Sequence, residues 1–236
     1  MTASQTRAMQ LDPSANWVVV AAFEEEEVIG AVLDDVRRHY PNVVVVNDGS
    51  RDRTGDIALA AGAIVIDHPI NVGQGAALQT GIKYALSRGA SFITTFDADG
   101  QQSADDIGLL IERLIQTQSE VALGSRFMGT AQGISLQRRL LLRAAIIFQY
   151  FTTGLWLSDA HNGLRVFTNA SARRLMIRQN RMAHASEIIA QIAAEHLRLV
   201  EVPCTIRYND YTRAKGQRTS AALHILIDLA IRRLYK

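Results

Sequence analysis

The chain has 236 residues, of which 48% are hydrophobic and 20% are charged. This is the composition of an ordinary globular protein, and the length fits one large domain with a sizeable core. The net charge of +2 gives no signature of a nucleic-acid partner. The single Cys204 excludes an internal disulfide and agrees with a reducing, cytoplasmic compartment. Residues 1–16 are polar, lack the apolar segment of a signal peptide, and are expected to form a flexible tail.

Short apolar runs alternate with helical segments through the first half of the chain. We expect strands at 18–22, 43–47, 63–67, 92–97 and 121–124, and helices at 28–36, 52–61, 75–87 and 104–116. Strands that are apolar throughout and separated by helices predict a mostly parallel sheet with helices on both faces, an α/β fold of the Rossmann type. In such sheets ligands bind beyond the carboxyl ends of the strands. Polar or glycine-rich segments follow all five strands, at 24–27, 47–50, 68–75, 97–101 and 125–126.

Two carboxylates, Asp97 and Asp99, come at the end of the strand expected at 92–97. Residues two apart in an extended chain point the same way, so both acids can face one point beyond the strand. Like charges held so close repel, and a divalent cation relieves that repulsion. Mg²⁺ or Mn²⁺ suits the site because it takes hard oxygen ligands and completes its shell with water and substrate phosphate. The pair is a candidate metal–diphosphate site, although Asp-X-Asp also occurs in ordinary turns.

The other strand ends each allow two interpretations. Asp48 either belongs to a turn before a capped helix or accepts hydrogen bonds from a base or ribose. Gly73 and Gly75 either form a plain loop or let the backbone approach a nucleotide closely. Arg126 either pairs with a phosphate or forms a surface salt bridge.

Five motifs in this order resemble the family 2 glycosyltransferases of GT-A fold, particularly those related to dolichyl-phosphate mannose synthase and bacterial polyprenyl-phosphate glycosyltransferases. The motifs are Ala21-Ala22-Phe23-Glu24-Glu25-Glu26, Asn47-Asp48-Gly49-Ser50, Asn71-Val72-Gly73-Gln74-Gly75, Asp97-Ala98-Asp99-Gly100-Gln101 and Gly124-Ser125-Arg126-Phe127. The resemblance extends from Val18 to Gln217. It implies a GT-A domain at 17–218, with a nucleotide-sugar half at 17–127 and an acceptor half at 128–218.

For the donor, the resemblance implies a UDP- or GDP-linked sugar bound by the first half. The residues implied to bind it are Ala22, Phe23, Glu25, Asn47, Asp48, Gly73, Gly75, Asp97, Ala98 and Asp99. Asp97, Asp99 and Gln101 are the implied ligands of Mg²⁺ or Mn²⁺. Four positions depart from the family pattern: Ala21 replaces proline, Glu24 replaces asparagine, Asn47 replaces aspartate and Gln74 replaces lysine. The last change removes a cation.

For the acceptor, the segments 159–167, 184–187 and 200–208 resemble the part of the family that re-enters the active site. A basic loop follows, and its counterpart in the relatives closes over phosphates. The implied acceptor- and phosphate-binding residues are His161, Asn162, Arg165, His184, Arg213, Lys215 and Arg218. The plain alternatives are structural histidines and a solvated loop.

The mechanism depends on the acceptor. Inversion at the anomeric carbon is implied by the family, with Arg126 and the cation stabilising the leaving diphosphate. An alcohol acceptor needs a general base, for which Asp159 is nominated first and Glu187 second. A lipid phosphate needs cations instead, and the basic residues of the second half favour it. The alternatives are transfer to a saccharide hydroxyl in cell-envelope polysaccharide synthesis, or a non-catalytic nucleotide-sugar-binding scaffold.

Two segments suggest contact with a membrane surface. Arg138, Arg139 and Arg143 precede or flank the apolar, aromatic-rich stretch 144–157, an arrangement typical of a helix lying at lipid headgroups. An amphipathic helix is also expected at 219–236, where its apolar face could meet the core, a second subunit or a small membrane protein. We therefore expect a cytoplasmic protein that can lie peripherally on the membrane and form a homo-oligomer.

Other enzyme classes share single motifs with this chain. A haloacid-dehalogenase-like phosphatase also has a strand ending in Asp-X-Asp-Gly, but there the motif usually opens the chain. A sugar nucleotidyltransferase would carry an arginine-containing, glycine-rich N-terminal loop, which is absent. A calcium loop fails because Gly100 stands where another residue is needed.

Overall fold

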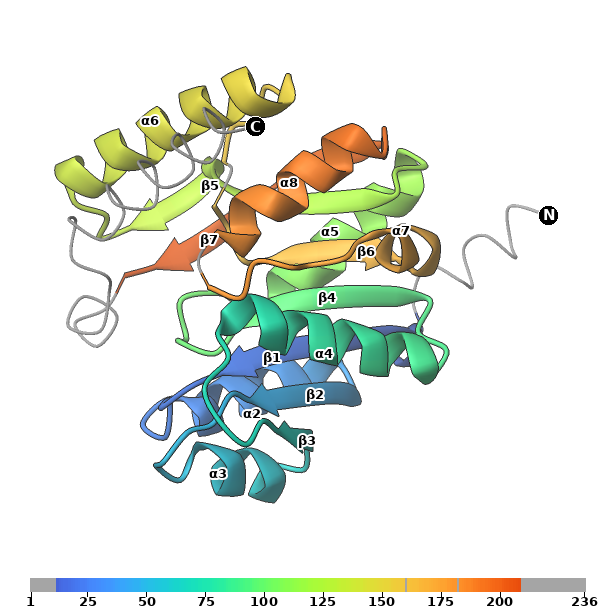
Figure 1. The fold of residues 1–236 in the computed structure, drawn as a ribbon, viewed down its shortest axis with the longest axis vertical. Helices are drawn as coiled ribbons and strands as arrows, with labels where there is room; N and C mark the ends of the chain where they lie inside the picture. The colour runs from blue at the N-terminus through green and yellow to red at the C-terminus, as the bar shows by residue number, and fades with distance from the viewer. Residues whose placement is uncertain (1–11, 160, 182, 209–236) are drawn as a thin grey trace.

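The computed structural model describes residues 12–159, 161–181 and 183–208. Its centre is a seven-stranded sheet in the order β3-β2-β1-β4-β6-β5-β7 (Figure 1). The strands are Asn16–Ala22 (β1), Asn42–Asn47 (β2), Ile64–Asp67 (β3), Phe92–Asp97 (β4), Val121–Gln132 (β5), Arg165–Thr168 (β6) and Leu199–Arg207 (β7). The expected tail, the helix expected at 219–236 and the loop with Arg213, Lys215 and Arg218 lie outside the described residues.

Most neighbouring strands run parallel, as the sequence predicts. β1 pairs parallel with both β2 and β4, and β5 pairs parallel with β7. β6 is the exception, because it runs antiparallel between β4 and β5. In this register Ala21 is the partner of Asp97, so the first and fourth motifs lie side by side at the carboxyl edge of the sheet.

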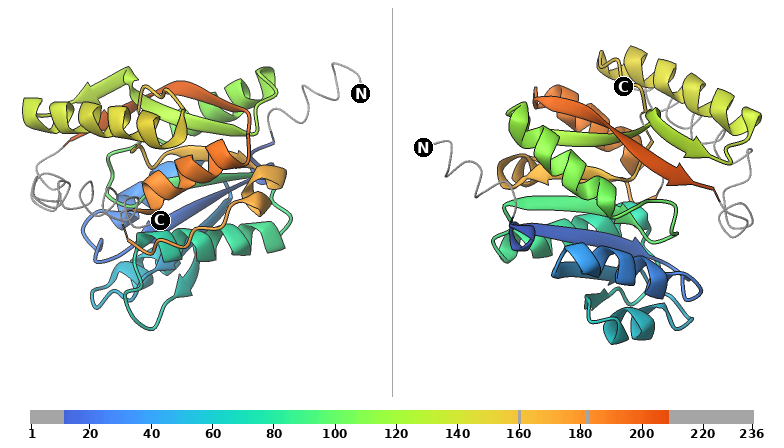
Figure 2. Two further views of the ribbon diagram at one scale, coloured as in Figure 1. Left: turned by 45° about the horizontal axis from the view of Figure 1, so that its top comes forward. Right: turned by 180° about the vertical axis from the view of Figure 1, so that it is seen from behind.

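Helices cover both faces of the sheet (Figure 2). They are Pro13–Ala15 (η1, a 3-10 helix), Ile29–His39 (α2), Thr54–Ala60 (α3), Gln74–Ser87 (α4), Asp105–Gln116 (α5), Leu136–Thr153 (α6), Asn169–Arg174 (α7) and His184–Ala194 (α8). The apolar sides of α2, α3 and α5 pack on one face of the sheet, and those of α4, α7 and α8 pack on the other. In α2 the buried residues Ile29, Val32, Leu33 and Val36 follow the helical repeat that predicted the element.

β5 is longer than expected and ends at Gln132, whereas the apolar run ends at Gly124. The register with β7 shifts between Ser125 and Thr130, after which pairing resumes as far as Arg207. Residues 128–130 of this extension are exposed. The extension depends on hydrogen bonding to a strand far along the chain, which local hydrophobicity does not encode.

α6 begins where the Ser135 side chain accepts the Arg138 backbone N–H at 3.2 Å, and it ends at Gly154, whose φ of 73° suits glycine. It therefore includes most of the stretch expected to lie at a membrane surface. No helix in the described part of the chain combines the length and the apolarity that crossing a membrane requires.

Candidate active site

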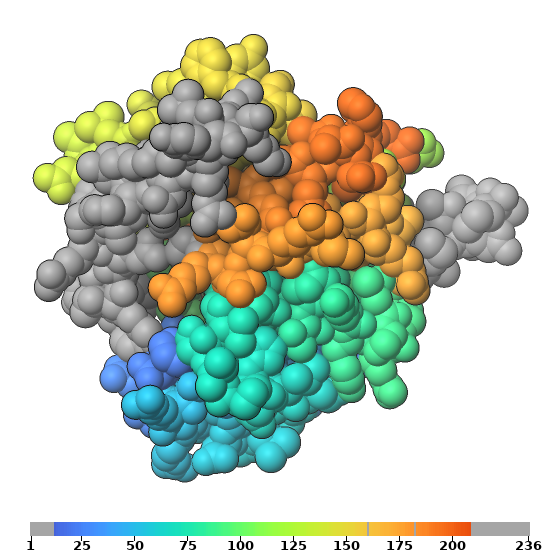
Figure 3. Space-filling model, viewed as in Figure 1, coloured from blue at the N-terminus to red at the C-terminus, as the bar shows by residue number. Residues whose placement is uncertain are grey.

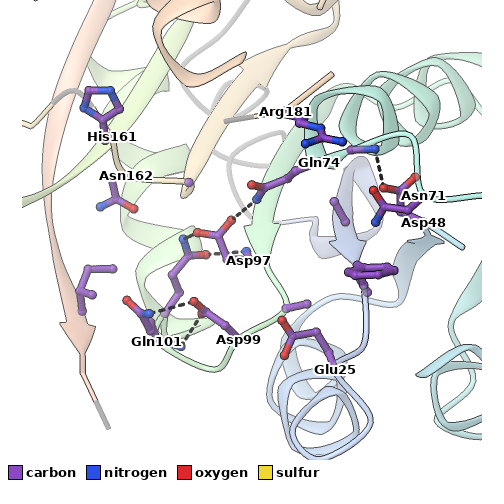
Figure 4. Close-up of a pocket in the computed structure, with 18 of the residues that line it drawn as sticks. Glu25, Asp48, Asn71, Gln74, Asp97, Asp99, Gln101, His161, Asn162 and Arg181 are labelled. Carbon is purple, nitrogen blue, oxygen red and sulfur yellow. Dashed lines mark hydrogen bonds between the residues drawn. The ribbon is translucent and has the colours of Figure 1, made fainter. Parts of the chain in front are cut away.

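A cavity of about 680 Å³ opens beyond the carboxyl ends of β1 and β4 (Figure 4). It contains most of the site residues that the sequence predicts. Those that line it are Ala22, Phe23, Glu25, Asp48, Gly73, Asp97, Ala98, Asp99, Gln101, Arg126, His161 and Asn162. Ala22 and Asp97, for example, are 75 positions apart in the chain and both line the cavity, because the parallel strands that carry them end at the same edge of the sheet.

Asp97 lies half-buried at the end of β4, held by two glutamine side chains. Gln74 Nε2 donates to its Oδ1 at 3.2 Å, and Gln102 Nε2 donates to its Oδ2 at 2.7 Å. Burial raises the pKa of Asp97 above its ordinary value, although the charges of Arg165 and Arg126 act in the opposite direction. The carboxylate is oriented by neutral amides and forms no ion pair with any residue that the structure describes.

Asp99 is two residues further on and closes the turn that follows β4. Its Oδ1 accepts the Gln101 backbone N–H at 3.0 Å, and its Oδ2 accepts Gln101 Nε2 at 2.9 Å. Burial, followed by repulsion from Asp97, raises the pKa of Asp99 to about 7. The charge of Asp97 therefore disfavours the ionised form of Asp99.

The donor set fits a hard divalent cation. Asp97, Asp99 and the amide of Gln101 offer hard oxygen atoms, and the pKa values of both carboxyl groups are raised, chiefly by burial, although nearby arginine charges act in the opposite direction. Among the described residues no group of three or more His, Cys, Asp and Glu side chains is placed to hold a metal. A cation here would therefore take its remaining ligands from diphosphate and water, as Mg²⁺ commonly does.

Asp48 is buried, and its carboxylate is fully engaged by the loop after β3. It accepts His68 Nδ1 at 2.7 Å, the Val72 backbone N–H at 3.0 Å and the Gly73 backbone N–H at 2.7 Å. The side chain thus fixes the glycine loop against the end of β2. Asn47 does not line the main cavity; its amide donates to Asp67 at 2.8 Å beside an adjoining cavity of about 500 Å³. The two cavities share Phe23 and Asn71.

Arg126 and Asp159 form a buried ion pair, with Arg126 Nε 2.6 Å from Asp159 Oδ2. The other arms of the guanidinium donate to Tyr208 Oη at 2.5 Å and to the His161 carbonyl at 3.0 Å. Burial disfavours the charge, but Asp159 and Tyr208 together outweigh it and hold the pKa of Arg126 above its ordinary value. Asp159 is 2% exposed and does not line the cavity. Asp159, which the sequence suggests as a general base, is thus the buried counter-ion of Arg126, which the sequence suggests as a phosphate-binding residue.

Arg165 corrects one expectation outright. It was expected to bind acceptor phosphate, but the side chain is 2% exposed and lies beneath the cavity floor. Burial lowers the pKa of Arg165 to about 10, with Asp97 and Asp159 acting in the opposite direction. Its Nη1 has no hydrogen-bond partner among the described residues. The Arg165 charge thus favours the ionised form of Asp97 from within the protein and does not line the cavity.

His184 and Glu187 are also absent from the residues that line the cavity. Burial and the charge of Arg165 lower the pKa of both His161 and His184 to about 4, so neither carries the charge that binding a phosphate would use at neutral pH. His184 is buried and does not line the cavity. Glu187 Oε2 accepts the backbone N–H groups of Arg178 and Gln179 at 3.0 and 2.8 Å, so this second nominated base holds a loop instead.

Gly75 is the remaining predicted residue outside the cavity lining. A side chain there would collide with the Gln179 carbonyl, because the loop before α8 rests directly on the start of α4. Glycine at this position permits the contact between the two halves of the chain.

The family model described as "Glycosyl transferase family 2" matches residues 17–177. The chain belongs to glycosyl transferase family 2. An uncharacterized protein of Methanocaldococcus jannaschii is 32% identical over 240 residues, covering 100% of this chain and 99% of that protein. The UDP-N-acetylglucosamine–dolichyl-phosphate N-acetylglucosaminyltransferase of Methanococcus voltae is 28% identical over 242 residues, covering 93% of this chain and 96% of that protein.

The solved structures show the same fold at lower identity. Glucosyl-3-phosphoglycerate synthase from Mycobacterium tuberculosis, in complex with Mn²⁺ and UDP-glucose, matches with a TM-score of 0.68 at 16% identity. The match covers 98% of this chain and 81% of that one. The expected GT-A fold is thereby confirmed.

Sequence reasoning missed several residues that line the cavity of this family 2 glycosyltransferase. Gln102 adjoins the metal motif and could have been found from its position. Gly163 lies so close to the Asp97 carboxylate that any added side chain would overlap it. Arg138 was assigned to a membrane surface, but it reaches the cavity and stacks 5.0 Å over the Tyr208 ring. Arg181 lies in a segment without any motif, so nothing local could identify it.

Proposed function

We propose that this family 2 glycosyltransferase moves a sugar from a UDP- or GDP-linked donor to the phosphate of a polyprenyl- or dolichyl-type lipid, with inversion and with a divalent cation. The observation that carries the proposal is the Asp97–Asp99 pair, which lines the cavity at the end of the central strand β4. The M. voltae relative is named for transfer from UDP-N-acetylglucosamine to dolichyl phosphate. That name supports both the donor class and the acceptor class.

The donor would lie with its nucleoside beside Phe23 and the loop fixed by Asp48, and with its diphosphate near Asp97 and Asp99. Asp97, Asp99 and Gln101 would hold Mg²⁺ or Mn²⁺. The cation, when bound, offsets the negative charge that develops on the departing nucleoside diphosphate. The crystallised relative from M. tuberculosis contains Mn²⁺ and UDP-glucose, which agrees with this chemistry.

The state of the two nominated bases favours a phosphate acceptor over a hydroxyl. Asp159 is paired with Arg126, and Glu187 is bonded to backbone N–H groups outside the cavity. A phosphate is already ionised near neutral pH, so its oxygen can attack without losing a proton to the protein. In that reaction a phosphate oxygen bonds to the anomeric carbon while the bond from that carbon to the diphosphate oxygen breaks. Arg138, which lies at the α6 side of the cavity, is the cation placed to receive the acceptor phosphate.

α6 offers a surface for the lipid. Four exposed apolar side chains of α6 lie on one side of the helix together with Arg143: Leu136, Leu140, Ile147 and Phe151. Trp156, which is also exposed, follows the end of the helix. Figure 3 shows α6 (yellow) along the upper edge of the molecule. A bilayer-surface position of this stripe would place lipid headgroups beside α6, whose opposite side carries Arg138 toward the cavity. This supports a peripheral position on the cytoplasmic membrane face.

The test is a transfer assay with purified protein, Mn²⁺ or Mg²⁺, a panel of UDP- and GDP-sugars, and either polyprenyl phosphate or the matching polyprenol. We expect sugar–phosphate–lipid product from polyprenyl phosphate alone, lost in Asp99→Ala and retained in Asp34→Ala, which removes an exposed carboxylate of α2. Donor binding without any turnover would favour the scaffold alternative. Transfer to a saccharide and none to lipid phosphate would favour the hydroxyl-acceptor alternative.

A further inference from the structure

Three arginines line the cavity, and their surroundings differ. Arg126 has all its arms bonded to Asp159, Tyr208 and a carbonyl. Arg138 stacks on the Tyr208 ring at the α6 side. The Arg181 guanidinium has no hydrogen bond or ion pair with the described residues; only its backbone carbonyl is bonded, to His184. Within the described residues, the Arg181 guanidinium is therefore the cation of this cavity that has no hydrogen bond, no ion pair and no stacked ring.

The loop that carries Arg181 is anchored from both sides. The Gly75 backbone N–H, in the first turn of α4, donates to the Asn180 carbonyl at 2.8 Å. The His184 backbone N–H and Nδ1 lie 3.0 and 2.9 Å from the Arg181 carbonyl. Glu187 bonds two further N–H groups of this loop. The position of Arg181 is thus set by the protein scaffold rather than by a free loop.

The Arg181 side chain lies over the glycine loop that follows β3. Its Cγ is 3.2 Å from the place where a Cβ on Gly73 would stand. Figure 4 shows Arg181 and Gln74 on the same wall of the cavity, with Asp97 below them. The Gln74 amide reaches Asp97 Oδ1, so this wall adjoins the carboxylate pair.

The charge on this wall is otherwise unfavourable for an anionic ligand. Glu25, Asp97 and Asp99 all line the cavity, and Gln74 is neutral where the family pattern has lysine. A diphosphate lying beside Asp97 needs positive charge on the side of the glycine loop as well. Arg181 is the cation present there.

We propose that Arg181 binds the diphosphate of the sugar donor and supplies, from the loop before α8, the positive charge that Gln74 does not. The inference rests on the proposed function, since it assigns a residue to the donor of that reaction. A guanidinium is suited to this position because its forked N–H groups can bond two phosphate oxygens at once.

The experiment measures dissociation constants by titration calorimetry at fixed Mg²⁺ for UDP, UMP, GDP and GMP, and then uses the base that wild-type protein prefers. The variants are Arg181→Ala, the double variant Arg181→Ala with Gln74→Lys, and the control Arg178→Ala. Arg178 lies on the same loop, is exposed and does not line the cavity. We expect Arg181→Ala to weaken diphosphate binding by roughly tenfold to a hundredfold, the range of a charged hydrogen bond. Monophosphate binding should change much less.

The added lysine in the double variant should restore most of the lost diphosphate affinity, while Arg178→Ala leaves it unchanged. The inference is overturned if Arg181→Ala binds the diphosphate as wild type does, or weakens mono- and diphosphate equally. If Arg181→Ala loses diphosphate affinity and the double variant does not regain it, the idea that Arg181 takes the place of the missing lysine is overturned. Absence of nucleoside-diphosphate binding by the wild-type protein would instead overturn the proposed function itself.

Discussion

Gln102 bonds Asp97 at two points, because its Nε2 donates to Asp97 Oδ2 at 2.7 Å and its Oε1 accepts the Asp97 backbone N–H at 3.0 Å. One side chain thus fixes both the backbone and the carboxylate at the end of β4. A carboxylate that is held in this way needs no rearrangement before it binds a cation.

The first prediction concerns this contact. Gln102→Leu keeps the bulk of the side chain but leaves the Asp97 carboxylate held by Gln74 alone, so Mn²⁺ affinity should fall by about 10- to 100-fold. Titration calorimetry with Mn²⁺ and the preferred nucleoside diphosphate measures the change. Gln116→Leu, an amide exposed at the end of α5, should bind as wild type does. Equal Mn²⁺ affinity in Gln102→Leu and wild type would show that Asp97 is positioned by other contacts.

The second prediction separates a structural from a catalytic role for Asp159. Asp159→Asn leaves the buried Arg126 charge without its counter-ion, which should cost about 3–5 kcal/mol of unfolding free energy. Urea unfolding measures it. Glu195→Gln, which breaks the exposed pair with Arg174, should cost no more than about 1 kcal/mol. An Asp159→Asn protein as stable as wild type but inactive would restore Asp159 as a general base.

The third prediction follows from the raised pKa of Asp99. Because the folded pKa of about 7 exceeds the unfolded value, this group contributes stability that is fully present below about pH 4 and is lost as pH rises through 7. With a chelator present to remove metal ions, the free energy of unfolding of the wild-type protein should therefore fall more between pH 5 and pH 8 than that of the Asp99→Asn variant. Chemical denaturation at both pH values measures the difference, which should be on the order of 2 kcal/mol. Parallel pH dependences of the two proteins would contradict the raised pKa.

The same ionisation predicts that cation binding releases a proton. Mn²⁺ affinity of the wild-type protein should rise from pH 6 to pH 8, since the cation replaces the proton that the pair otherwise holds. Calorimetry in two buffers of different ionisation enthalpy detects the released proton. A pH-independent affinity would contradict it.

The fourth prediction tests the exposed stripe of α6. Leu140→Ser with Phe151→Ser removes two side chains that are 58% and 74% exposed, so folding should be little affected. Sedimentation with anionic vesicles should show at least about a tenfold loss of binding, because each large apolar side chain contributes about 1.5–3 kcal/mol when buried. Leu109→Ser, on α5 at the back of the sheet, is the matched control. Unchanged vesicle binding of the α6 variant would remove this helix from the membrane contact.

The sheet and the floor of the cavity could be predicted from the sequence because both depend on local patterns. Apolar runs marked the strands, and the order of polar segments after them placed Asp48 and Asp97 at one edge. The state of the charged groups could not be predicted, because it depends on which distant residue lies behind each one. Arg165 is buried because it begins β6, a strand in the interior of the sheet. Asp159 is paired with Arg126, which is 33 positions away. Arg181 reaches the cavity only because its loop packs on the start of α4.

The place of β6 has a consequence for how the chain can be divided. β6 belongs to the half expected at 128–218, yet it lies between β4, which belongs to the half expected at 17–127, and β5, which spans the boundary between the two halves. Severing the protein between these halves would strip β4 and β5 of a shared neighbour and leave open sheet edges prone to aggregation. During synthesis the centre of the sheet can therefore form only after residue 168 has been added. For the same reason we do not expect the two halves to be exchangeable between relatives.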